Sequence, residues 1–227
     1  MIKVIIGGIG SGKTLTTVKE IITRNKNCYV NFDIKYRGAT RLKESHIIKE
    51  TLHEKGKPKL SVNWEFWNKL IREGKQFDIY IDEAHNVLNS RRSMSTWNNL
   101  FTSWITQIRK LLGSSEQNHL YLITQRLNSL DLVVRDLCHL IIYCNKIQST
   151  EKSTTTIIEN GRIKEKKLPN TWIIKTIFFG NYCIDKFNAF IENQSELNDG
   201  KTIFLGNPFF KYYDSFSLVT FGESVYI

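Results

Sequence analysis

The chain has 227 residues, of which 41% are hydrophobic and 24% charged, as in an ordinary globular protein. This length suffices for one α/β domain with a large core and a small appendage, and the composition excludes a disordered chain, a collagen and a disulfide scaffold. The 32 basic side chains exceed the 22 acidic ones and leave a formal charge of +10. Such a surplus favours a polyanionic partner, either nucleic acid or an anionic membrane surface, although a basic surface without a partner is the simpler alternative.

The cysteines and the hydropathy of the chain indicate the cellular compartment of the protein. Cys28, Cys138, Cys144 and Cys183 form no CxxC pair, and free thiols in apolar runs suit a reducing cytosol. The N-terminal apolar stretch is too short for a signal peptide, and no run approaches the 18 or so apolar residues of a membrane span. We therefore expect a cytoplasmic protein without a membrane span, in the host cytoplasm if the chain is viral.

The first half of the chain begins with a short β-branched run, Ile2–Ile6, which we predict to be a buried strand. The apolar spacing after Lys13 is helical, and residues 28–32 predict a second strand. Residues 35–60 are charged and predicted to be irregular. Residues 64–71 place their apolar side chains on one helical face, and Gly74 is a suitable stop for that helix.

Strands and helices continue to alternate up to about residue 145. Apolar runs predict strands at 77–81, 119–124 and 140–144, and residues 97–112 predict an amphipathic helix with basic residues in its last turn. This alternation predicts an α/β fold with a mainly parallel central sheet flanked by helices.

The pattern changes beyond residue 150. Two strand-like segments flank Asn160-Gly161, the strongest short-range signal for a hairpin, and residues 171–179 predict a further strand. The remaining tail is rich in aromatic residues, including Phe210 and Tyr213. We predict a core domain at 1–150 and a small accessory β-rich extension at 151–227 packed on it.

Residues 7–14 fit the phosphate-loop pattern G-x-x-x-x-G-K-[ST] between a predicted strand and a predicted helix. Glycines let successive backbone N–H groups point at phosphate oxygens, while the helix dipole favours the same anion. The lysine can span the β- and γ-phosphates and the threonine hydroxyl suits Mg²⁺. The alternative is a glycine-rich turn with a chance lysine. The predicted ATP-binding residues are Gly7, Gly8, Ile9, Gly10, Ser11, Gly12, Lys13, Thr14 and Leu15.

An acid pair, Asp82 and Glu83, ends the predicted strand 77–81. The carboxyl ends of parallel strands meet at the crevice where ligands bind, so Asp82 together with Thr14 can hold Mg²⁺ and Glu83 can accept a proton from the attacking water. The alternative is that the two acids only cap the next helix. Gln125, which ends another predicted strand, can orient that water or sense the γ-phosphate, or can simply cap the strand.

Residues 1–145 contain four distinctive segments: GGIGSGKTL, CYVNFDI, IYIDEAH and LITQRLNSLDLVVRDL. Together these segments resemble the zonular-occludens-toxin-like ATPases of the FtsK/HerA group of DNA-translocating and genome-packaging P-loop proteins. The tail sequence KYYDS at 211–215 is similar to a short tyrosine motif of Zot-like proteins. The resemblance implies an acid-pair P-loop core that hydrolyses ATP with Mg²⁺, acts on DNA, and self-assembles, often into a ring with shared active sites.

The chain departs from the phage-export members of that family in having no membrane-spanning segment, which favours a motor that packages a viral or mobile-element genome. Relatives also often carry an arginine in the strand after the glutamine, where this chain has His139-Leu140-Ile141. An arginine finger then has to be Arg126 or Arg135, and we favour Arg135, with a surface salt bridge to Asp131 or Asp136 as its alternative role.

Three functions remain open from the sequence. The first is the DNA-translocating or packaging ATPase, the second an export ATPase that works with a separate membrane partner, and the third a slow nucleotide-dependent regulatory switch. Asp82-Glu83-Ala84-His85 also spells a helicase motif, but such helicases need two motor domains and the chain is long enough for one. We therefore expect His85 to be a helix-start residue.

Overall fold

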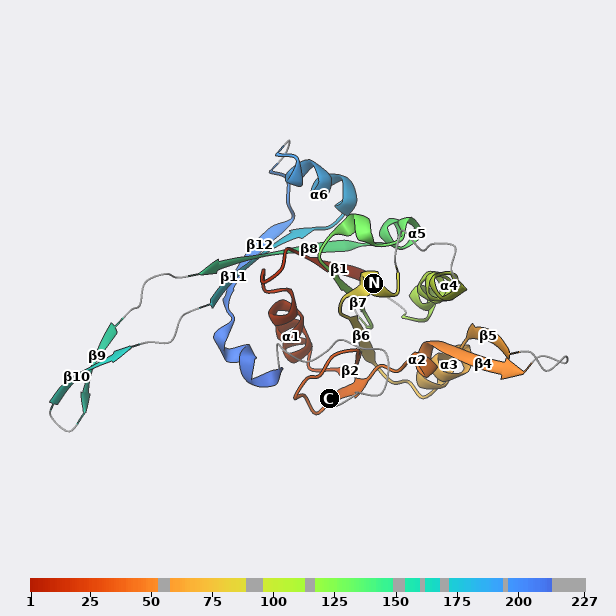
Figure 1. Ribbon diagram of the computed structural model, residues 1–227, viewed down its shortest axis with the longest axis horizontal. Helices are drawn as coiled ribbons and strands as arrows, with labels where there is room; N and C mark the ends of the chain where they lie inside the picture. The colour runs from red at the N-terminus through yellow and green to blue at the C-terminus, as the bar shows by residue number, and fades with distance from the viewer. Residues whose placement is uncertain are drawn as a thin grey trace.

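The computed structural model describes residues 1–52, 58–88, 96–112, 117–148, 154–159, 162–167, 172–193 and 196–213. Their centre is an eight-stranded sheet (Figure 1). The strands run in the order β12 (Gly200–Leu205), β11 (Trp172–Phe179), β8 (Leu140–Gln148), β1 (Ile2–Ile6), β7 (Leu120–Thr124), β6 (Phe77–Ile81), β2 (Asn27–Val30) and β3 (Ala39–Arg41). Neighbours from β8 to β3 are parallel, whereas β11 and β12 are antiparallel. The expected mainly parallel α/β fold is therefore confirmed.

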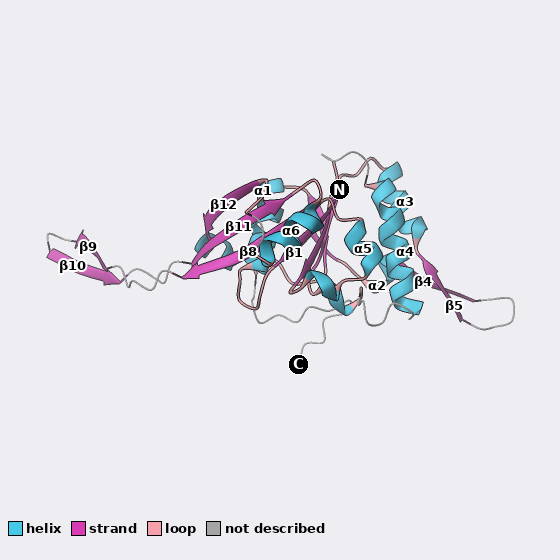
Figure 2. Cartoon of the chain, turned by 90° about the horizontal axis from the view of Figure 1, so that it is seen from above, coloured by secondary structure: helices cyan, strands magenta, loops and turns pink. Residues whose placement is uncertain are grey.

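Helices cover both faces of the sheet, as the alternation of apolar residues along β1 requires. Val4 belongs to a buried cluster that also contains Trp104, whereas its neighbour Ile5 belongs to a second cluster with Val18 of α1. Helix α1 (Lys13–Arg24) therefore covers one face. Helices α3 (Trp64–Arg72), α4 (Thr96–Leu111), α5 (Leu132–Asp136) and α6 (Cys183–Ile191) contribute to the cluster on the other (Figure 2).

A buried ion pair fixes α1 to the sheet. Asp78 of β6 is 1% exposed and accepts two hydrogen bonds from the Arg24 guanidinium, one of them from Nη2 to Oδ1 at 3.1 Å. Asp78 Oδ1 also accepts from the backbone N–H of His119 at 2.7 Å. Removing one partner of such a pair costs about 3–5 kcal/mol because the other charge is left buried. Asp78 is thus a structural acid, four residues before the acid pair on the same strand.

The expectation that residues 35–60 are irregular is wrong. They contain β3, a single turn of helix α2 (Glu44–Ile47), and a hairpin of β4 (Ile48–Leu52) with β5 (Pro58–Val62), joined by 53–57, which lie outside the described residues. Ile48 pairs with Val62 and both are buried in the cluster with α3 and α4. In β5, Lys59 and Ser61 alternate with Leu60 and Val62, so charged and polar residues conceal a period of two in this part of the segment.

The chain after residue 150 extends the same sheet. Strand β11 pairs with β8 from Trp172 opposite Gln148 to Phe179 opposite Ile141, and β12 adds a further edge strand. A short 3₁₀ helix, η4 (Asn207–Tyr212), then returns to α1. The predicted hairpin is confirmed as β9 (Thr154–Glu159) paired with β10 (Arg162–Lys167), and it extends away from the sheet (Figure 1). Its Asn160-Gly161 turn and residues 214–227 lie outside the described residues.

Candidate nucleotide-binding site

The phosphate loop lies between the end of β1 and the start of α1, as predicted. Gly10 and Gly12 have φ angles of 70° and 93°, a left-handed backbone that other residues adopt at a cost. Gly12 is also enclosed, because an added Cβ would lie 2.4 Å from Cδ1 of Ile174 on β11. The first turn of α1 has neither an acidic residue nor a side-chain cap, so its N–H groups remain available to an anion.

Lys13 and Thr14 open α1 and point into the site. Lys13 is 8% exposed, and its Nζ donates a hydrogen bond to the carbonyl oxygen of Gly8 at 3.0 Å, which keeps the ammonium inside the loop. The Thr14 hydroxyl donates to Oδ2 of Asp82 at 3.4 Å. The structure therefore brings the end of the phosphate loop and the first acid of the predicted pair together, across a sequence distance of 68 residues.

Asp82 is held firmly at the end of β6. The side chain of Asn31, which follows β2, donates to the carbonyl of Asp82 at 2.9 Å and accepts from its backbone N–H at 2.7 Å. Burial raises the pKa of the Asp82 carboxyl, while the N–H of Glu83, the charge of Lys13 and the Thr14 hydroxyl act in the opposite direction. The sequence did not single out Asn31, which lies in the middle of the segment CYVNFDI, directly after β2.

Glu83 adopts a left-handed backbone, with φ 48° and ψ 44°, at the start of a short 3₁₀ helix, η1 (Ala84–Asn86). Its side chain makes no capping hydrogen bond to that helix, so the alternative role of a simple cap is not what the structure shows. Oε2 of Glu83 instead lies 3.3 Å from Nδ1 of His85, and the same nitrogen is 3.4 Å from the hydroxyl of Thr124. His85 lies in this short helix, one residue after its first residue Ala84, and also connects the acid with the end of β7.

Gln125 follows directly after β7, the strand that lies between β1 and β6. The register pairs Ile6 with Thr124, so Gln125 stands beside Gly7 at the carboxyl edge of the sheet. Gln125 does not line the cavity at the phosphate loop, however, although it is partly buried. The structure thus places it at the predicted edge, next to the loop.

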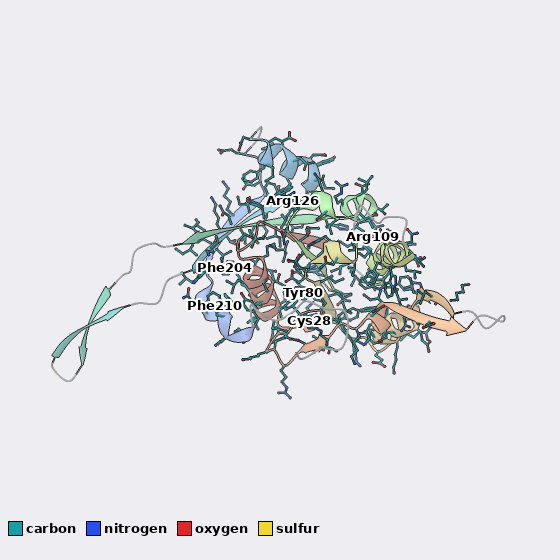
Figure 3. The ribbon with its side chains drawn as sticks, in the orientation of Figure 1. Cys28, Tyr80, Arg109, Arg126, Phe204 and Phe210 are labelled. Atoms are coloured by element: carbon teal, nitrogen blue, oxygen red, sulfur yellow. The ribbon has the colours of Figure 1, made fainter. Side chains whose placement is uncertain are left out.

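Arg135 lies outside its own chain's cavity. It belongs to α5, and its Nη1 donates to Oδ1 of Asn128 at 2.9 Å. Within the described part of the chain, Arg135 forms no ion pair with Asp131 or Asp136, the alternative that the sequence left open. Arg126 is exposed immediately after Gln125 (Figure 3). Two further arginines that follow the acid pair in the sequence, Arg91 and Arg92, lie outside the described residues.

A cavity of about 510 Å³ opens in front of the loop, a size typical of small-ligand sites. The loop and the acid pair line one side of it, through Gly10–Leu15, Asp82 and Glu83. The other side was not predicted, because its residues come from distant parts of the chain: Phe32, Lys146, Trp172, Phe210 and Tyr213. Burial, and then the charge of Asp82, raise the pKa of Tyr213, which agrees with its place in the same cavity. Gly7, Gly8 and Ile9 lie outside this lining.

The sheet and the loop at the end of its central strand place the chain in the P-loop NTPase class. The chain belongs to the zonular occludens toxin (Zot) family, whose model matches residues 1–170.

Several solved structures are similar to the chain to different degrees. The N-terminal domain of zonular occludens toxin from Neisseria meningitidis is 16% identical, with a TM-score of 0.54 over 94% of this chain and 98% of that one. The genome packaging NTPase B204 of Sulfolobus turreted icosahedral virus 2, with ATP-γS, is 16% identical, with a TM-score of 0.38 over 63% of this chain and 74% of that one. The DNA-packaging ATPase B204 of Sulfolobus turreted icosahedral virus is 18% identical, with the same TM-score of 0.38 and the same coverage, 63% and 74%. No curated protein matches the chain. Among the described residues, no helix combines the length and the apolar character needed to cross a membrane.

Proposed function

We propose that this chain is an ATP-hydrolysing motor that translocates or packages DNA, the genome of a virus or a mobile element. The observation that carries the ATPase part is the approach of Thr14 to Asp82, with 3.4 Å between the hydroxyl and the carboxylate oxygen. These two oxygens stand beside a loop in which Gly10 and Gly12 adopt a left-handed backbone and Lys13 Nζ donates to the carbonyl of Gly8. Such an arrangement serves the binding and cleavage of a nucleoside triphosphate.

The donor set at Thr14 and Asp82 fits Mg²⁺. Mg²⁺ prefers oxygen ligands, retains several waters, and is usually bound through one or two protein oxygens together with substrate phosphates. A hydroxyl and a carboxylate that lie in contact can share one such ion. When bound, Mg²⁺ neutralises charge on the phosphates. The protein's own contribution is to hold both oxygens, through α1 for Thr14 and through Asn31 for Asp82.

Glu83 is the general base of the proposal. Its carboxylate lies in the cavity that holds the phosphate loop and would take a proton from the attacking water. His85 orients this carboxylate and ties it to Thr124, the residue before Gln125. Gln125, at the neighbouring strand end, would position the water or sense the γ-phosphate.

The remaining parts of the proposal concern assembly. Residues 1–150 would form the ATPase core and residues 151–227 the extension. The chains would assemble into a homo-oligomer of the FtsK/HerA kind, such as a ring. Arg135 lies outside its own cavity but is partly exposed, so it would act on the site of a neighbouring subunit. Buried free thiols at Cys28 and Cys144 suit a reducing cytoplasm.

DNA is the proposed partner because of the charge of the chain. Beyond the formal charge of +10, β10 carries the sequence RIKEKK on a hairpin that extends away from the sheet (Figure 1). Lysine and arginine on such an arm bind phosphate backbones with little sequence preference. A regulatory switch would have no need of this contact.

We expect double-stranded DNA to stimulate steady-state ATP hydrolysis, and we expect the affinity for DNA to fall steeply between about 50 and 200 mM salt. Changing Lys164, Lys166 and Lys167 of β10 together to glutamine should reduce the slope of log affinity against log salt by about three. The matched control changes Lys69, Lys75 and Lys110, on and near α3 and α4, to glutamine.

Three outcomes would contradict the DNA motor. Slow turnover that ignores DNA would favour a regulatory switch, and DNA affinity that ignores salt would exclude binding through phosphate contacts. Stimulation by an anionic membrane but not by DNA would favour the export ATPase.

A further inference from the structure

The unpredicted side of the cavity is a wall of aromatic rings that comes largely from the extension. The Trp172 ring, at the start of β11, meets the Phe210 ring of η4 edge to face, with 5.9 Å between centroids. The Phe210 ring in turn lies nearly parallel to the Tyr213 ring, at 6.4 Å and 21°. All three residues line the same cavity as the phosphate loop.

These rings are not fully used by the hydrophobic core. Trp172 and Phe210 belong to neither buried cluster, and Phe210 is 38% exposed. An aromatic residue that packs into no core and faces a cavity is available to a ligand. The Nζ of Lys146, on β8, lies 3.4 Å from the centroid of the Trp172 ring and places a positive charge at this wall.

The wall is fixed with respect to the phosphate loop by backbone contacts. Trp172 donates from its N–H to the side chain of Asn207 at 2.8 Å and accepts from the N–H of Gly206 at 2.7 Å. Gly206 packs so closely on α1 that an added Cβ would lie 3.0 Å from Cδ1 of Leu15. On the other side, Lys35 donates from its N–H to the carbonyl of Tyr212 at 2.6 Å. The rings therefore stand at a set distance from the loop before any ligand arrives.

We infer that the aromatic wall of Trp172 and Phe210 stacks the base of the nucleoside triphosphate whose phosphates bind the loop. This inference rests on the proposed function and deepens it, because it makes the extension part of the nucleotide site. A flat, partly apolar base presents its face to such rings, and base–aromatic stacking tolerates different bases because every base has a π-face. The phosphates extend from there toward Lys13 and Thr14, in one continuous cavity.

The test compares ATP with inorganic tripolyphosphate, which has the phosphates but no base. Dissociation constants for both are measured by calorimetry with Mg²⁺ on the full chain. For Trp172→Ala we expect ATP to bind about fivefold to 150-fold more weakly, the effect of losing one stacked base. Tripolyphosphate should bind as it does to the unmodified chain. Trp172→Phe should restore most of the ATP affinity.

Phe204→Ala is the matched control. Phe204 also lies in the extension near α1, where Lys19 contacts its ring at 4.9 Å, but it does not line the cavity (Figure 3). Its loss should change neither affinity. If Trp172→Ala does not fold by circular dichroism, Phe210→Ala takes its place with the same expectation.

Two results would overturn the inference while leaving the proposed function standing. One is an equal loss of ATP and tripolyphosphate binding in Trp172→Ala, which would mean that Trp172 only shapes the loop. The other is unchanged ATP affinity in Trp172→Ala and Phe210→Ala. If the unmodified chain binds neither ligand, the proposed function itself fails and the inference with it.

Discussion

Changing Glu83 to glutamine is expected to slow ATP turnover by about a hundredfold or more while ATP still binds. Glutamine keeps the size of the side chain and its hydrogen-bonding oxygen but cannot take a proton from water. The left-handed backbone of Glu83 and its contact with His85 hold the side chain in place at the cavity. Steady-state turnover and the dissociation constant for ATP, measured on the same preparation, separate chemistry from binding.

Asp82→Asn is the matched control for this change, because it alters the adjacent acid in the same way. We expect it to weaken the Mg²⁺-dependent part of ATP binding, since Asp82 contacts Thr14 and Glu83 does not. Turnover of Glu83→Gln close to that of the unmodified chain would show that Glu83 is not the base.

We expect ATPase activity to return in part when two inactive variants, Arg135→Ala and Lys13→Ala, are mixed. Arg135→Ala should lose about 10³–10⁵ in rate, the usual contribution of an arginine finger, and Lys13→Ala should be inactive through loss of phosphate binding. In a head-to-tail ring, an equal mixture would place both intact residues at about one quarter of the interfaces and so restore part of the activity. Coupled-enzyme assays across mixing ratios measure this recovery.

Two further variants, Arg109→Ala and Arg126→Ala, are each mixed with Lys13→Ala in the same way. Arg109 lies in the last turn of α4 and should have no effect, whereas Arg126, exposed after Gln125, is the other candidate for a finger. Recovery with Arg126→Ala but not with Arg135→Ala would reassign the finger. If mixed oligomers form and neither mixture regains ATPase activity, neither Arg126 nor Arg135 acts on the site of a neighbouring subunit.

The sequence predicted those parts of the site that depend on neighbouring residues. The β1 run and the glycines before Lys13 are local signals, and the apolar strand before Asp82 is another, so loop and acid pair were both found. Their approach to each other also followed, because parallel strands bring their carboxyl ends to one edge. The order of the strands did not have to be known for this prediction. Strand β7 lies between β1 and β6, and all three parallel strands end at the same edge of the sheet.

The rest of the site depends on contacts between distant segments. Asn31 is an ordinary polar residue until β2 pairs with β6 and brings it to Asp82. The aromatic wall requires β11 to pair with β8, which sets Trp172 opposite Gln148, and requires η4 to return to α1. Nothing in the local pattern of the tail specifies these pairings, so Phe210 and Tyr213 could be recognised as aromatic but not assigned to a cavity.

We propose that the loop before α1 binds ATP for hydrolysis. The most direct test measures the Mg²⁺-dependent release of phosphate from ATP by the purified chain and by Lys13→Ala. Lys13 donates only to Gly8 within the loop, among its described contacts, and packs in neither hydrophobic cluster. We expect hydrolysis by the unmodified chain and none by Lys13→Ala, with unchanged circular dichroism. Equal hydrolysis by both proteins, or none by the unmodified chain with Mg²⁺ and DNA present, would contradict this proposal.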